Sequence, residues 1–332
     1  MDLCTPLGLA AVWSSELSER RPRAIAVVGT TASGKSALAL RAAEAAGAAE
    51  IISVDSMAVY REMDIGTAKP SKAERDRVPH HLIDILDPSE ECTVSLFQAA
   101  ARAAIDDVAD LGAAPLLVGG TGLYHRAVID NLEIPGQFPE VRLELEQRAA
   151  SDLGGLHREL LRLDPLAAGR IEPQNERRIV RALEVIGGTG RPFSSFGPGL
   201  EHYGESEIQQ VGLRVAPARV DEAIEARVSE WMATGFLEEV AALSQRPGGL
   251  SRTARQAIGY AELLAHLNGE CSLDEATKET VRRTRAFARR QRSWFNRDPR
   301  IKWFDEADEL FEVLVSHLND LVWPQTAGAV GD

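Results

Sequence analysis

Short apolar runs alternate with helix-like stretches over the first third of the chain. Each run has the length and the flanking Gly, Pro or polar residues that are typical of a buried strand. The predicted strands cover residues 24–28, 50–54, 81–85 and 115–119. Helical periodicity covers residues 36–46 and 95–111 between them. Strands separated by helices predict an α/β fold with a parallel, doubly wound sheet.

The pattern changes after Pro135. Residues 141–186 have helical periodicity and many charges of both signs, with no strand pattern. A strand pattern returns at 211–215, and long helices are predicted at 219–244 and 273–295. The second half of the chain is therefore mostly helical.

These patterns predict a helical module inserted into an α/β core that ends in helices. The predicted parts are a disordered extension at 1–22, the core at 23–134 and 201–324, the inserted module at 135–200, and a flexible tail at 325–332. The extension has a short apolar patch but no basic segment before it, so we do not expect a cleaved signal.

Composition places the chain among ordinary globular proteins, with 44% hydrophobic and 26% charged residues. No apolar run approaches the roughly 20 residues that cross a bilayer. Three scattered cysteines, Cys4, Cys92 and Cys271, form no metal-binding spacing and favour a reducing compartment. We therefore expect a cytoplasmic protein without a zinc site.

A phosphate-binding loop follows the first predicted strand. It fits the pattern G-x-x-x-x-G-K-[ST] and precedes a helix, which is the context that supports the motif. Its residues are Gly29, Thr30, Thr31, Ala32, Ser33, Gly34, Lys35 and Ser36. Backbone N–H groups and the helix N-terminus favour phosphate there. Lys35 adds a full charge, and the Ser36 hydroxyl suits Mg²⁺.

The loop alone does not indicate ATP hydrolysis. A motor or switch NTPase needs a second strand that ends in an acid which helps to hold Mg²⁺. The strand at 115–119 instead runs into Gly120, Thr121 and Gly122 without a carboxylate. The acid that does follow a core strand is Asp55, at the edge where ligands bind in such sheets. Asp55 there can hold a metal or act as a general base.

Several segments together resemble the tRNA dimethylallyltransferase (tRNA isopentenyltransferase) family, in its bacterial form. They occur in order over residues 24–304, so the likeness is not one borrowed motif. The segments are 29–36, Asp-Ser-Met-Ala-Val-Tyr at 55–60, Met-Asp-Ile-Gly-Thr-Ala-Lys-Pro at 63–70, 80–84, Leu-Val-Gly-Gly-Thr-Gly-Leu-Tyr at 117–124, 178–185, 257–260 and 289–295. One departure is Thr30, where the family usually has Pro.

The resemblance implies transfer of a dimethylallyl group from dimethylallyl diphosphate to N6 of adenosine 37 in tRNAs that read UNN codons, with Mg²⁺ as cofactor. In that reaction Asp55 is the implied base, Thr121 lies near the reacting centre, and Arg255 contacts the diphosphate. We expect a monomer. The implied tRNA-binding residues are Asp55, Ser56, Met57, Ala58, Thr121, Arg142, Arg177, Arg178 and Arg181. Several of them make the inserted module a predicted tRNA-binding element, with the anticodon stem-loop as partner.

The net charge of −13 argues against a nucleic-acid-binding protein, but positive charge is concentrated in one segment. Between Thr280 and Lys302 there are nine bases and one acid, Asp298, with Trp294 and Phe295 among them. Such a basic strip predicts contact with backbone phosphates. The arginines at 177–181, by contrast, would ordinarily be interpreted as a solvated helix face.

Three other functions fit part of the sequence. A P-loop small-molecule kinase shares the core but leaves the inserted module and the basic strip unexplained. An adenylate isopentenyltransferase uses the same chemistry on a free nucleotide. An RNA-binding protein with a vestigial P-loop gives Asp55 and Thr121 no role.

Overall fold

The computed structural model describes residues 23–322, which form two compact units. The first contains residues 23–129 and 205–322, and the second contains residues 130–204. The predicted extension at 1–22 and the predicted tail at 325–332 lie outside the described residues. Within these residues, no helix is both long and apolar enough to cross a membrane.

The first unit is built on one parallel six-stranded sheet, in the order β3-β2-β4-β1-β5-β6. The strands are β1 (Ala24–Val28), β2 (Ala49–Val54), β3 (His80–His81), β4 (Ala114–Gly119), β5 (Ile208–Leu213) and β6 (Lys302–Phe304). The predicted parallel, doubly wound α/β fold is confirmed. The strand predicted at 81–85 is wrong in extent, because only two residues pair with β2. Short β6 was not predicted.

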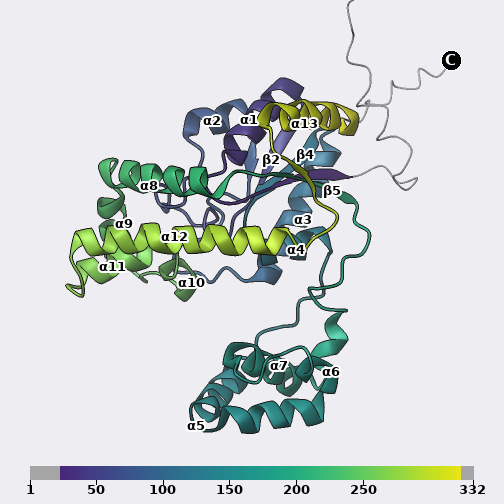
Figure 1. Ribbon diagram of the computed structural model, residues 1–332, viewed down its shortest axis with the longest axis vertical. Coiled ribbons are helices and arrows are strands. Elements are labelled where there is room, and N and C mark those ends of the chain that lie inside the picture. The colour runs from purple at the N-terminus through teal and green to yellow at the C-terminus, as the bar shows by residue number, and fades with distance from the viewer. Residues whose placement is uncertain (1–22, 323–332) are drawn as a thin grey trace, which may run out of the picture. The chain divides into compact units, whose positions relative to one another are not determined.

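The helices of the first unit follow the strands in the chain and cover both faces of the sheet (Figure 1). They are α1 (Lys35–Ala46), α2 (Lys72–Arg77), α3 (Val94–Asp110), α4 (Gly122–Ile129), α8 (Pro217–Ala233), α9 (Phe236–Ser244), α10 (Arg252–Arg255), α11 (Tyr260–Leu267), α12 (Leu273–Phe295) and α13 (Ala307–Leu321). The single helix predicted at 219–244 is two helices. Gly235, in the left-handed region with φ 102°, begins the second of them.

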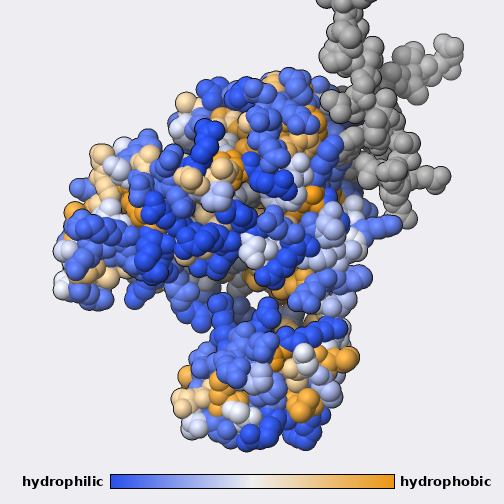
Figure 2. Space-filling view, viewed as in Figure 1, coloured by the Kyte–Doolittle hydropathy of each residue, from blue (hydrophilic) through white to orange (hydrophobic). Residues whose placement is uncertain are grey.

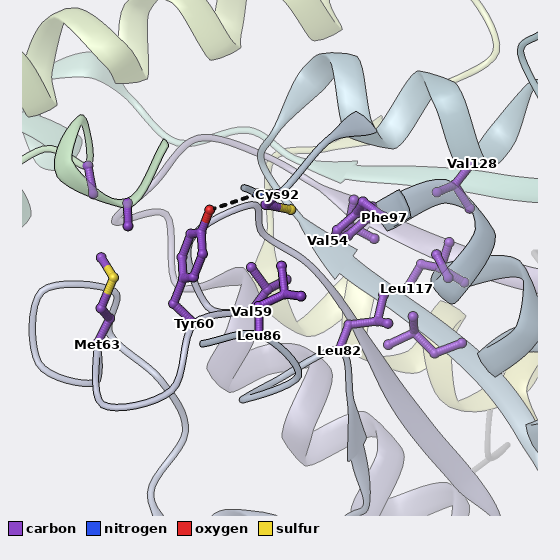
Figure 3. Close-up of a cluster of buried hydrophobic side chains, with 14 of the residues drawn as sticks. Val54, Val59, Tyr60, Met63, Leu82, Leu86, Cys92, Phe97, Leu117 and Val128 are labelled. Carbon is purple, nitrogen blue, oxygen red and sulfur yellow. Dashed lines mark hydrogen bonds between the residues drawn. The ribbon is translucent and has the colours of Figure 1, made fainter. Parts of the chain in front are cut away.

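Alternate residues of β1 point to two separate cores, as the period of a strand requires. Ile25 and Val27 pack with α1 and α13 on one face. Ala24 and Ala26 belong to the core on the other face, with Phe97 of α3. Figure 3 shows part of this second core, where the buried Tyr60 hydroxyl accepts a hydrogen bond from the Cys92 backbone N–H (3.1 Å). Because both faces are covered, β1 is apolar throughout and fully buried.

The second unit is helical, with α5 (Pro139–Leu163), α6 (Pro165–Ala168), α7 (Glu176–Thr189) and the short 3₁₀ helix η2 (Phe193–Phe196). Its own apolar core lies mainly between α5 and α7 and includes Leu156, Leu160 and Ile179. The predicted insert at 135–200 falls inside this unit.

Candidate active site at the carboxyl edge of the sheet

Three loops leave neighbouring strands at the same level of the sheet. Val54 of β2 and Val28 of β1 both pair with Gly119 of β4. The next residues along the chain are therefore Asp55, Gly29 and Gly120. Since parallel strands share one carboxyl edge, the register brings the phosphate loop, the predicted base and the Gly-rich turn to one place.

Glycine at this edge allows the backbones to approach closely. A Cβ on Gly119 would lie 2.1 Å from the Val54 carbonyl oxygen. A Cβ on Gly120 would lie 2.4 Å from the Gln291 Nε2 atom and 3.1 Å from the Gly29 carbonyl oxygen. The end of β4 and the turn after it can therefore carry no side chain at these positions without displacing β2, the phosphate loop or α12.

The phosphate loop has the expected strand–loop–helix form. Ala32 and Gly34 adopt positive φ angles of 59° and 84°, and Gly34 is the N-cap of α1. The Lys35 ammonium donates to the Thr30 carbonyl oxygen (3.2 Å) across the loop. Residues 29–34 form the loop, and Lys35 and Ser36 begin α1, an arrangement that attracts phosphate at the helix N-terminus.

Two cations lie at this loop. Burial lowers the pKa of Lys35 to about 8; nearby Asp55 opposes that shift and Arg227 adds to it. Arg227, on α8, reaches the loop directly, with its Nη1 atom 3.4 Å from the Thr31 hydroxyl. Burial also lowers the pKa of the Arg227 guanidinium. Among residues 23–322, no carboxylate lies within ion-pair distance of either cation, so the site carries positive charge that an anion can neutralise.

Arg227 is a candidate that sequence reasoning missed. A signal existed, because the buried face of α8 carries Val220, Ile224 and Val228. Arg227 follows Val220 by seven positions and Ile224 by three, so it shares their apolar face. A charge in register with an apolar stripe indicates either a buried ion pair or a ligand-binding cation. The structure is needed to decide between them, and it shows no ion pair of Arg227 within the described residues.

Asp55 holds the turn that follows β2. Its Oδ1 atom accepts from the backbone N–H groups of Met57 (2.8 Å) and Ala58 (3.4 Å). Its Oδ2 atom makes no hydrogen bond or ion pair within the described residues. The Thr121 hydroxyl lies 3.5 Å from the Ser56 backbone N, which joins this turn to the Gly-rich turn after β4. One half-buried carboxylate oxygen is therefore free for a ligand beside the phosphate loop.

Arg255 is not joined to the phosphate loop by any contact. It lies exposed at the end of α10, and its guanidinium has no hydrogen bond or ion pair within residues 23–322. The same short helix is tied to the Asp55 side of the site, because the Thr253 hydroxyl bonds the Tyr60 hydroxyl. A role for Arg255 toward diphosphate stays a prediction.

The predicted arginines of the second unit are of two kinds. Arg142 (3.3 Å) and Arg181 (2.9 Å) both pair with Glu184, which is 1% exposed. These two arginines neutralise a buried acid, which is a structural role. Arg177 and Arg178, on the same helix α7, are exposed and have no ion pair in the described part of the chain. They are the better candidates for phosphate contacts.

The basic strip along α12 is weaker than its sequence predicts. Arg282 pairs with Glu279, Arg283 with Glu262 of α11, Arg285 with Glu225 of α8, and Arg300 with Asp298. Figure 2 shows the hydrophilic surface over α12. Within residues 23–322, four arginines of the strip have no ion pair: Arg289, Arg290, Arg292 and Arg297. Counting charges from Thr280 to Lys302 left out Glu279, one turn earlier on α12, and the acids Glu262 and Glu225 of other helices.

Comparisons with known proteins identify the family. The sequence model of the IPP transferases matches residues 58–298. The chain belongs to the IPP transferase family. It is 49% identical to the tRNA dimethylallyltransferase of Streptomyces avermitilis over 86% of this chain and 91% of that protein. It is 48% identical to the Thermobifida fusca enzyme of the same name, with 88% and 94% covered.

Solved structures of IPP transferases show the same fold. The crystal structure of a tRNA isopentenylpyrophosphate transferase from Bacillus halodurans is 37% identical, with a TM-score of 0.65 over 91% of this chain and 98% of that one. A eukaryotic dimethylallyltransferase acting on tRNA is 26% identical, with a TM-score of 0.71 over 85% and 73%. The predicted family and fold are confirmed.

A metal in this IPP transferase would depend on its substrate for most of its ligands. No group of three His, Cys, Asp or Glu side chains in residues 23–322 is placed to hold a metal ion. The exposed Ser36 hydroxyl is one oxygen ligand. Mg²⁺ commonly takes one or two protein oxygens and completes its shell with phosphate oxygens and water. The residues present fit a Mg²⁺ ion that arrives with a diphosphate.

Proposed function

We propose that this protein transfers the dimethylallyl group of dimethylallyl diphosphate to N6 of adenosine 37 in tRNAs that read UNN codons. The observation that carries the proposal is the shared strand register at Val28, Val54 and Gly119. It sets an anion-binding loop beside a carboxylate with a free oxygen, which are the two groups that this reaction needs. The names of the relatives support the same reaction.

The proposed reaction is a substitution at the first carbon of the prenyl group. The N6 lone pair forms the new C–N bond, the C–O bond to diphosphate breaks, and the diphosphate leaves with the electron pair. Lys35, Arg227 and the loop N–H groups stabilise the charge on the departing oxygens. Bound Mg²⁺, held through Ser36, would neutralise part of the same charge. Asp55 takes the N6 proton through its free oxygen.

The acceptor base must leave the stacked anticodon loop before it can reach Asp55, at a cost of a few kcal/mol. The turn at Asp55, Ser56, Met57 and Ala58 and the hydroxyl of Thr121 are the proposed acceptor side of the site. Arg255, Arg177 and Arg178 are proposed to contact substrate phosphates, since they are exposed and unpaired in the described chain. Arg142 and Arg181 are proposed to shape the inserted, tRNA-binding unit through Glu184. We expect the enzyme to act as a monomer in the cytoplasm.

The test is a prenyl-transfer assay with purified protein, Mg²⁺, dimethylallyl diphosphate and unmodified tRNA for a UNN codon. We expect N6-dimethylallyladenosine at position 37 and an equal amount of diphosphate. Parallel reactions replace tRNA with AMP, or the prenyl donor with ATP. Product with AMP and none with tRNA would favour the free-nucleotide enzyme, and phosphate transfer from ATP would favour the kinase.

The pKa of Lys35 makes donor binding depend on pH. In the free protein the amine is charged below about pH 8 and loses its charge above it. A bound diphosphate holds the amine protonated, so its affinity is full below pH 8 and weakens above it, by up to about tenfold per pH unit. We expect the donor dissociation constant, measured by calorimetry, to rise from pH 8 to 9.5. Lys35→Met should bind weakly without this rise. A flat profile in the unaltered protein contradicts the assignment.

A further inference from the structure

A buried glutamine joins two of the three loops of the site. Gln291, on α12, is 5% exposed. Its Oε1 atom accepts from the Thr31 backbone N–H in the phosphate loop (2.8 Å). Its Nε2 atom donates to the carbonyl oxygen of Gly120 in the turn after β4 (2.8 Å). One side chain therefore bonds the backbone on the donor side and on the acceptor side.

The contact is tight and has little freedom. A Cβ on Gly120 would lie only 2.4 Å from the Gln291 Nε2 atom, so the amide fills the space that a side chain would need. Trp294, three positions later on the same face of α12, packs in the same way against Gly122, where a Cβ would lie 2.4 Å from the indole ring. Thr121 lies between these two glycines, so α12 supports the backbone on either side of it.

A glutamine that is at least half-buried is more often a satisfied part of the packing, and the half-buried Gln98 shows that case. Its amide nitrogen donates to the Ala127 carbonyl oxygen (2.9 Å), away from the three loops of the site. Gln291 differs because its two bonds join the loops that follow β1 and β4, beyond the last paired residues of those strands. The Thr31 bond also fixes the first half of the phosphate loop.

We propose that Gln291 is a positioning residue that fixes the phosphate loop and the Thr121 turn relative to each other. The attacking N6 atom and the departing diphosphate are then aligned on opposite sides of the reacting carbon. The inference rests on the proposed prenyl transfer. Gln291 is expected to affect the geometry of the transition state and to have little effect on the binding of either substrate. A displacement of about 1 Å in such a site can cost on the order of 100-fold in rate.

The experiment compares Gln291→Met with the control Gln98→Met, in which a half-buried amide is replaced at similar volume. For Gln291→Met we expect kcat for tRNA prenylation to fall roughly 10- to 100-fold, with KM for each substrate within about threefold of the unaltered enzyme. Gln98→Met should keep kcat within about threefold. Equal losses in the two variants, an unchanged kcat, or a raised KM alone would overturn the proposal.

A second comparison tests whether the effect passes through Thr121. In the Thr121→Val background, Gln291→Met should cost much less in kcat than it does alone, because the group that it positions is already absent. Losses that multiply in full contradict the proposal. If Gln291→Met does not fold, as judged by thermal unfolding, Gly120→Ala disturbs the same bond from the other side and should give the same kcat loss. The unaltered enzyme is assayed in parallel, and its failure to prenylate tRNA would instead reject the proposed function.

Discussion

Replacing Asp55 with asparagine is expected to slow prenyl transfer by on the order of 100- to 10,000-fold in a single turnover, the range for loss of a general base. Asparagine keeps the Oδ1 acceptor for the backbone N–H groups of Met57 and Ala58, so the turn should keep its shape. The free oxygen becomes an amide nitrogen, which cannot accept the N6 proton. We therefore expect tRNA affinity to change little while the chemical step slows.

The measurement is a rapid-quench single turnover with enzyme in excess over tRNA, together with tRNA binding by filter retention. The control is Asp87→Asn, because Asp87 also accepts from a backbone N–H two positions later, that of Ser89 (3.0 Å). That variant should react within about threefold of the unaltered rate, as expected for a change outside the catalytic machinery. An unchanged rate in Asp55→Asn removes Asp55 as the base, and a loss of tRNA affinity that accounts for the whole effect makes it a binding residue.

Replacing Arg227 with methionine is expected to cut kcat/KM for dimethylallyl diphosphate by roughly 30- to 5,000-fold. This range corresponds to the 2–5 kcal/mol that is lost when one partner of a buried charge pair is removed. The partner here is the diphosphate, since no carboxylate in the described chain pairs with Arg227. Without ligand the variant should be no less stable than the unaltered protein, because a half-buried cation without a partner is unfavourable.

Thermal unfolding with and without magnesium diphosphate separates these effects. The unaltered protein should gain stability on binding, and the Arg227→Met variant should gain much less at the same concentration. Arg219→Met is the matched control, since Arg219 lies on the same helix with its side chain exposed. Equal stabilisation of all three proteins by diphosphate would show that Arg227 does not bind it.

The sequence by itself determined the local chemistry of the donor site. The phosphate loop is a continuous segment whose glycines, lysine and serine act within one turn, so its pattern and its flanking strand and helix predict it fully. The same holds for β1, β2 and β4, whose apolar runs follow from burial on both faces. Asp55 was predictable because an acid directly after a buried strand lies at the carboxyl edge of the sheet.

Tertiary structure alone decided which charged and polar groups meet. Gln291 bonds Thr31 across 260 positions of sequence, and nothing near either residue indicates the other. Glu225 of α8 and Glu262 of α11 form ion pairs with arginines of α12, and Glu184 forms an ion pair with Arg142. Arg227 stays without a carboxylate partner in residues 23–322, which makes it a ligand candidate. The physical reason is that pairing depends on distances of a few ångströms between segments, which only the packing of helices on the sheet sets.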